Sequence, residues 1–101
     1  MFIFDTSYLI TDEPVILSTS TRRIGTYINN PDPIYLRCLT DAVPPPYQYK
    51  WNGPGEGLQV GETATHIIQT PTKDSQFGKY VCTASNTAGF ARHTVEVVKI
   101  G

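Results

Sequence analysis

The chain has 101 residues, 40% of them hydrophobic and 17% charged, and its eight basic and nine acidic residues give a formal net charge of −1. This length and composition predict one globular domain with a small core rather than a disordered segment. Its one basic cluster, Arg22-Arg23, carries too little positive charge to neutralise the phosphates of DNA or RNA, so no nucleic-acid partner is expected.

The N-terminal region, residues 1–13, is interpreted as a lead-in or linker before a single domain over residues 14–101. Met1–Asp5 is apolar but lacks the basic start and small-residue cleavage site of a signal peptide, so we expect a piece excised from a longer protein. Phe2-Ile3-Phe4 and Tyr8-Leu9-Ile10 are candidates for a lead-in strand or for contact with a preceding domain. No stretch reaches the roughly twenty apolar residues of a transmembrane helix, so no direct membrane insertion is expected.

Short β-prone runs separated by turn residues follow along the first half of the chain. Residues 14–18 predict a first strand that opens on a proline, and residues 24–28 predict a second piece at a sheet edge. Residues 29–33 have the composition of a turn. In the next strand, over residues 34–40, period-two alternation places Ile34, Leu36 and Cys38 on one face.

The second half continues this pattern. Three prolines end the pairing, and a strand over residues 47–51 places its three aromatic residues on one side. After the glycine-rich turn 52–57, residues 58–60 and 64–70 are the next candidate strands, although the pattern does not decide whether Ile67 or Ile68 points inward.

The last two predicted strands cover residues 79–86 and 91–100, joined by a turn over Thr87-Ala88-Gly89. Tyr80, Cys82 and Ala84 are expected to point inward. Seven or eight short strands at regular spacing, with no helical period, predict an all-β antiparallel sandwich.

The segment Gly78-Lys79-Tyr80-Val81-Cys82-Thr83-Ala84-Ser85-Asn86-Thr87-Ala88-Gly89 resembles strand F and the F–G turn of I-set domains of the immunoglobulin superfamily. This resemblance covers about residues 14–100 and implies an immunoglobulin-like Greek-key β-sandwich. By the same likeness Cys38 belongs to strand B, Trp51 to strand C and Cys82 to strand F, and Tyr80 supplies a corner hydrogen bond to backbone a few residues upstream.

A disulfide between Cys38 and Cys82, beside a buried Trp51, is the pairing that the resemblance implies. Neither His66 nor His93 has the spacing to a cysteine that a zinc site needs, so no metal is expected. The disulfide would close the loop between Cys38 and Cys82, which is expected to stabilise the fold by ~4 kcal/mol. A persistent disulfide favours an oxidising compartment.

Two features depart from the family pattern. The acidic residue usual two positions before the glycine of Gly-x-Tyr-x-Cys is replaced by Gln76, and the nearest acid is Asp74, so we do not carry over the family's ion pair. The stretch between Trp51 and Ile67 is expected to be too short for the extra C′ and C″ strands of a variable-type domain. Antibody-like antigen recognition is therefore disfavoured.

Several short motifs have competing interpretations. Pro44-Pro45-Pro46-Tyr47 matches a WW-domain ligand, but a stiff loop leading into a strand is the preferred interpretation. The glycine-rich turn 52–57 lacks the Lys-Ser/Thr ending of a phosphate-binding loop. A catalytic triad of His66 or His93 with Asp74 and a serine lacks a nucleophile elbow, so no enzyme activity is predicted. Arg22-Arg23 is interpreted as a solvated edge.

Residues that alternate outward on strands G, F and C form the candidate interaction face. The candidate positions are Gln48, Lys50, Val81, Thr83, Glu96 and Val98, with Asn52 and Ser85 on the same side. The resemblance implies a module for protein–protein recognition or spacing, as one domain of a larger extracellular adhesion molecule or receptor, with an unknown protein and neighbouring tandem domains as partners and no cofactor. The alternative is a structural domain of a cytoplasmic muscle or cytoskeletal protein, and the redox state of Cys38 and Cys82 would distinguish the two.

Overall fold

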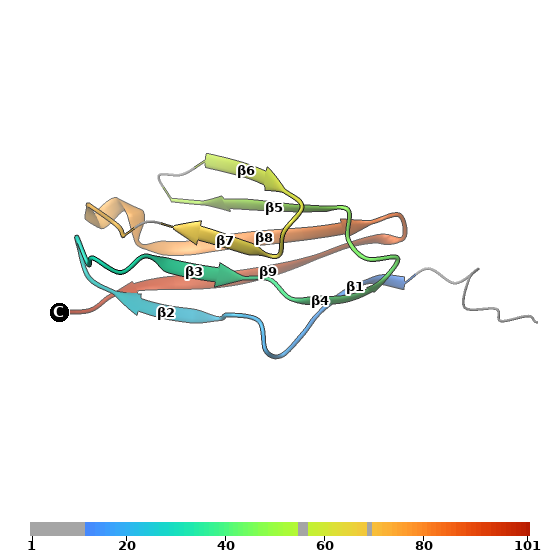
Figure 1. Ribbon diagram of the computed structural model, residues 1–101, viewed down its shortest axis with the longest axis horizontal. Coiled ribbons are helices and arrows are strands. Elements are labelled where there is room, and N and C mark those ends of the chain that lie inside the picture. Colours follow the sequence, from blue (N-terminus) through green and yellow to red (C-terminus); the bar gives the residue numbers. More distant parts are fainter. Residues whose placement is uncertain (1–11, 55–56, 69) are drawn as a thin grey trace, which may run out of the picture.

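The computed structural model describes residues 12–54, 57–68 and 70–101, and these fold as two layers of β-strands (Figure 1). The strands are β1 (Asp12–Ile16), β2 (Arg23–Thr26), β3 (Ile34–Arg37), β4 (Thr40–Val43), β5 (Gln48–Gly53), β6 (Gly57–Gly61), β7 (Thr65–Ile68), β8 (Gly78–Asn86) and β9 (Gly89–Lys99). One turn of 3-10 helix, Asp74–Gln76, precedes β8. Within the described ranges, no helix is long and apolar enough to cross a membrane.

One layer is a five-stranded sheet in the order β2-β9-β8-β5-β6, and the other consists of the pairs β1-β4 and β3-β7. The predicted immunoglobulin-like sandwich is therefore confirmed. The pairing of β2 with β9 is parallel, whereas all other pairs are antiparallel among the described strands. In Figure 1, β3 and β7 lie in front of β8 and β9.

The core lies between the two layers and follows the period-two pattern of each strand. On β7 the burial pattern resolves the ambiguity left by the sequence, because Ile68 is 4% exposed and Ile67 is 59% exposed. Contributions come from both layers and form one cluster: Ile34, Leu36, Cys38, Tyr49, Trp51, Ile68, Tyr80, Cys82, Ala84, Val95 and Val97.

The strand predicted over residues 34–40 is interrupted in the structure. The Ser20 hydroxyl donates to the Leu39 carbonyl at 2.9 Å and accepts from the Leu39 N–H at 2.8 Å. The Leu39 carbonyl also accepts from the Leu17 N–H at 2.8 Å. At this point the chain changes partner, from β7 along β3 to β1 along β4.

The stretch between Trp51 and Ile67 was expected to be too short for both C′ and C″, and the structure has one strand there before β7, close to the strand predicted over residues 58–60. Strand β6 pairs with β5 over five register positions, from Tyr49↔Gly61 to Gly53↔Gly57. No second added strand occurs among the described residues before β7.

Candidate interaction face and core constellation

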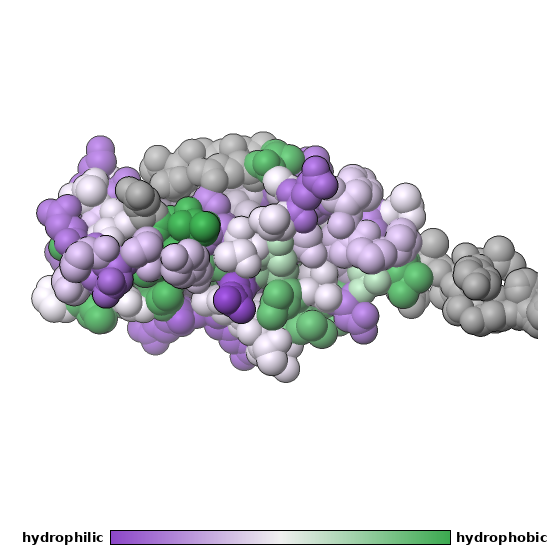
Figure 2. All heavy atoms as spheres, in the orientation of Figure 1, coloured by the Kyte–Doolittle hydropathy of each residue, from purple (hydrophilic) through white to green (hydrophobic). Residues whose placement is uncertain are grey.

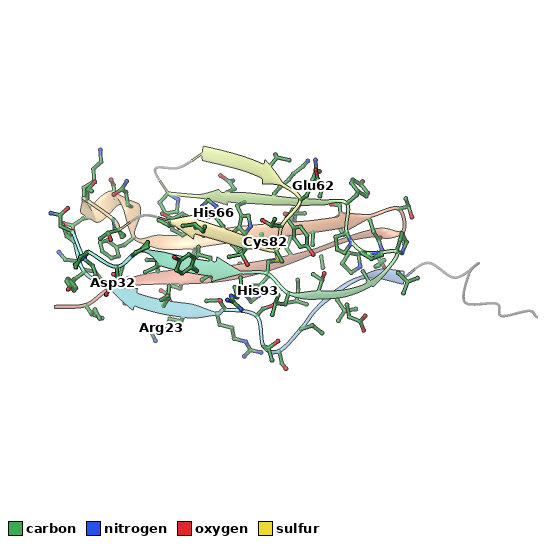
Figure 3. All side chains as sticks on the ribbon, in the orientation of Figure 1. Arg23, Asp32, Glu62, His66, Cys82 and His93 are labelled. Atoms are coloured by element: carbon green, nitrogen blue, oxygen red, sulfur yellow. A yellow bond between two sulfur atoms is a disulfide. The ribbon has the colours of Figure 1, made fainter. Side chains whose placement is uncertain are left out.

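Cys38 and Cys82 form a disulfide that joins the two layers, as predicted. Both cysteines are fully buried, and Figure 3 shows Cys82 between the layers. Trp51 lies beside them, 4% exposed, and its register partner on β8 is Cys82. On its other side the indole stacks on His66, with ring centroids 5.5 Å apart.

Tyr80 is buried and ties two loops to the start of β8. Its hydroxyl donates to the Gln76 carbonyl at 2.7 Å and lies 3.1 Å from the Pro54 carbonyl. Its ring packs directly on Gly53, where any Cβ would clash with the ring carbons. Gly78 has a φ of +134°, a conformation that only glycine adopts readily, and this allows the chain to enter β8 from the 3-10 turn.

Gln76 explains how the chain manages without the family's acidic residue. Its side-chain oxygen accepts from the Thr72 N–H at 2.6 Å and from the Lys73 N–H at 3.3 Å. Asp74 instead pairs with Lys99 of β9 at 2.9 Å on the exposed surface. Here an amide closes the turn, and the ion pair that does form uses different residues.

The outward side chains of β5, β8 and β9 form a continuous surface, which we call the outer face. The register places them in rows across the three strands, since paired residues of antiparallel strands point to the same side. All of the predicted positions lie in these rows. The members of the outer face are Gln48, Lys50, Asn52, Lys79, Val81, Thr83, Ser85, Phe90, Arg92, Thr94, Glu96 and Val98.

The sequence interpretation missed the outer-face residues nearest the β8–β9 hairpin. Phe90 is 55% exposed, and the Arg92 guanidinium lies over its ring at 5.1 Å from the centroid. Alternation along residues 91–100 was sufficient to find Arg92 and Thr94, because Val95 and Val97 already mark the inward positions. Phe90 lies between the predicted turn at residues 87–89 and the strand predicted over residues 91–100, whereas β9 begins at Gly89.

The β8–β9 hairpin is held rigidly beside this surface. The Asn86 side-chain oxygen accepts the N–H groups of Ala88 and Gly89 at 2.9 and 3.0 Å. Its amide nitrogen donates to the Pro44 carbonyl at 3.0 Å and so ties the hairpin to the proline-rich loop. This loop ends at Tyr47, whose N–H donates to the Ser85 carbonyl at 3.0 Å while its side chain is exposed.

The residues considered for catalysis lie apart in the structure. His66 is buried on β7 against Trp51, and half-buried His93 on β9 contacts the carbonyl of Thr21. Figure 3 shows the two histidines on different strands. Asp74 is exposed and belongs to the pair with Lys99. In the described part of the chain, no three His, Cys, Asp or Glu side chains gather as a metal site would require.

Arg22 and Arg23 are both exposed at the start of β2. Arg23 lies beside Glu96, its register partner on β9, with a nitrogen–oxygen distance of 3.9 Å. At this distance and exposure the pair contributes little to stability. Arg23 therefore extends the outer face by one strand.

Comparison with known proteins assigns this architecture to a class. A shallow two-layer sandwich with an inter-layer disulfide, a buried tryptophan and a tied tyrosine is an immunoglobulin-type domain. The family model described as "Immunoglobulin domain" matches residues 13–86. The chain belongs to this family.

Solved structures of similar shape come from several proteins. The neural ectodermal development factor IMP-L2 has a TM-score of 0.74 at 18% identity, covering 89% of this chain and 45% of that one. A structure on Dscam isoform specificity has a TM-score of 0.69 at 19% identity, covering 90% of this chain and 25% of that one. Titin domain M7 has a TM-score of 0.66 at 19% identity, covering 91% and 98%. A comparison with curated protein sequences found no match.

Proposed function

We propose that this domain is a non-catalytic protein-recognition module that belongs to a larger extracellular adhesion molecule or receptor. The observation that carries the proposal is the outer face, where an exposed aromatic ring and an arginine stand together on a rigid sheet. Phenylalanine and arginine are among the residue types enriched in the buried cores of protein interfaces. A sheet that holds its side chains in fixed rows also loses little conformational freedom on binding.

The disulfide supports the extracellular part of the proposal, because such bonds persist in oxidising compartments. Support for a tandem arrangement comes from the similar structures, which include four consecutive immunoglobulin domains of Dscam1 and five of Sidekick-1. The chain spans less than half of the IMP-L2 chain and a fifth of the Sidekick-1 chain.

Binding of the multimerised domain to the surface of cells from the source organism tests the recognition role. We expect Phe90→Ser to reduce binding about tenfold, as for loss of an interface anchor. Tyr35→Ser is the matched control, because Tyr35 is a similarly exposed aromatic, at 49%, on the opposite layer. Equal binding by the two variants, or no binding by the wild-type domain, would overturn the proposal.

Figure 2 shows the layer that carries this control. Hydrophobic atoms on the β3–β7 side form small separate patches among polar ones. Tyr35 and Ile67 are register partners there, and both are exposed. A change at Tyr35 therefore alters an exposed apolar position without touching the outer face.

A structural role in a cytoplasmic muscle or cytoskeletal protein is the second candidate. It is favoured by the match to titin domain M7, which this chain covers almost completely. Alkylation of free thiols followed by mass spectrometry, on protein from the native source, separates the two candidates. We expect Cys38 and Cys82 to be quantitatively protected; free thiols in the native protein would favour the cytoplasmic role.

A further inference from the structure

We infer that the partner bound by the outer face presents an acidic protein surface. This inference rests on the proposed function, since it specifies the chemistry of the partner at the same face. Its basis is a separation of charge across the fold that the overall net charge of −1 conceals.

Four of the eight basic residues stand on or beside the outer face. Thr83 on β8 has two register partners, Lys50 on β5 and Arg92 on β9. Lys79 and Arg23 lie in the same way on the two sides of Glu96. The two rows thus place one basic side chain on each of the four neighbouring strands β2, β9, β8 and β5.

Glu96 is the one acidic residue that the described strands contribute to this face. It is flanked by Arg23, at 3.9 Å, and by Lys79 across the β8–β9 pair. Counting Arg23, Lys50, Lys79 and Arg92 against Glu96 gives four positive charges and one negative charge, a local excess of three.

The other described acidic residues lie elsewhere. Glu13 and Asp41 line a shallow hollow between β1 and β4, in the opposite layer. Figure 3 labels Asp32, which precedes β3, and Glu62, which follows β6. Asp74 forms an ion pair with Lys99. Of the described carboxylates, only that of Glu96 lies within the basic rows.

The row that contains Lys50 and Arg92 is the best-formed part of this surface. Neighbouring strands are about 4.8 Å apart, so the two residues stand about 10 Å apart with the Thr83 hydroxyl between them. Arg92 also covers the Phe90 ring, which combines a cation with an apolar contact. A partner surface with carboxylates around an apolar residue complements this arrangement in both charge and hydropathy.

A sheet that carries basic and apolar side chains side by side favours a protein partner over a sulfated glycan or a nucleic acid. Val81 lies between Asn52 and Thr94 on the same face, and Val60 on β6 is the exposed register partner of Lys50. Sulfated glycans and nucleic acids would leave these apolar side chains without a contact.

The test is an NMR titration of the isotopically labelled domain with a ten-residue poly-L-glutamate peptide, at low salt. We expect shift changes on β5, β8 and β9 near Lys50, Thr83 and Arg92, and their loss when salt shortens the range of the electrostatic attraction. The double variant Lys50→Glu/Arg92→Glu is expected to weaken binding about tenfold or more.

Arg37→Glu/Lys73→Glu is the matched control, because it changes the net charge equally at exposed positions outside the outer face. Equal weakening by the two double variants would show that only net charge matters, and shift changes centred away from the outer face would place the site elsewhere. Either result overturns the inference, and so does tighter binding of a heparin decasaccharide than of the peptide.

The same two double variants in the cell-binding assay separate this inference from the proposed function. Binding that depends on Phe90 but not on Lys50, Arg92 or salt would retain the recognition role and reject the acidic partner. Binding that is insensitive to Phe90→Ser would reject the recognition role itself.

Discussion

Tyr80 shows how a single hydroxyl links the chain's most recognisable motif to the fold. It lies four residues after Gln76, whose carbonyl it binds, and its ring occupies the space that the absent side chain of Gly53 leaves. Tyr80 and its neighbours Cys38, Trp51 and Cys82 are therefore a requirement of the core, and all four are buried away from any partner.

Replacing Tyr80 with phenylalanine is expected to lower the free energy of unfolding by about 1–2 kcal/mol, because the carbonyls of Gln76 and Pro54 lose their hydroxyl donor. Urea denaturation measures this change. Tyr27→Phe, at an exposed tyrosine, is the control and should have little effect. A loss of partner binding by Tyr80→Phe without any loss of stability would contradict this view of the residue.

At the scale of elements, alternation and turn chemistry predicted most strands to within two residues. The first strand was displaced, since β1 begins at Asp12 and includes Pro14 rather than opening on it. The register shifts between Asp12 and Val15, which is where a proline can enter a strand without breaking a ladder bond. A bulge of this kind depends on the partner strand and cannot be read from the local sequence.

Other features depend on contacts that are distant along the chain. Where the chain changes partner, Leu39 is bound by Ser20, nineteen residues away, and β2 pairs in parallel with the distant strand β9. The choice between Ile67 and Ile68 required the register with β3, because two adjacent isoleucines satisfy either alternation. The basic rows of the outer face combine residues from four strands, so they depend on the register of β2, β5, β8 and β9.

The two isoleucines of β7 give a matched pair of variants. Ile68→Ala is expected to lower the free energy of unfolding by about 2–4 kcal/mol, because it leaves a cavity in the core. Ile67→Ala removes the same atoms from an exposed position and should change stability by less than about 0.5 kcal/mol. Thermal and urea unfolding of both proteins would test this assignment, and similar losses would mean that the register of β7 is wrong.

At the scale of the whole molecule, the described chain enters and leaves at opposite ends of its long axis. Figure 1 shows β1 starting at one end and the C-terminus at the other. Copies joined end to end would therefore lengthen an array and leave each outer face directed to the side.

The parallel pairing of β2 with β9 has a mechanical consequence for such an array. The two strands run in the same direction, and tension enters through the N-terminal end of β2 and leaves through the C-terminal end of β9. The bonds from Glu96 N–H to the Arg22 carbonyl and from Ile100 N–H to the Thr26 carbonyl are then loaded together, in shear, rather than one after another.

Pulling single molecules from both termini tests this load path. Ile24→Pro removes an N–H donor from the middle of this ladder and should lower the unfolding force more than Ile68→Ala does, when the two are compared at equal loss of equilibrium stability. An equal drop in force would mean that resistance resides in the core. If the drop is larger for Ile24→Pro, the edge strand that carries Arg23 beside the outer face is also the domain's mechanical clamp.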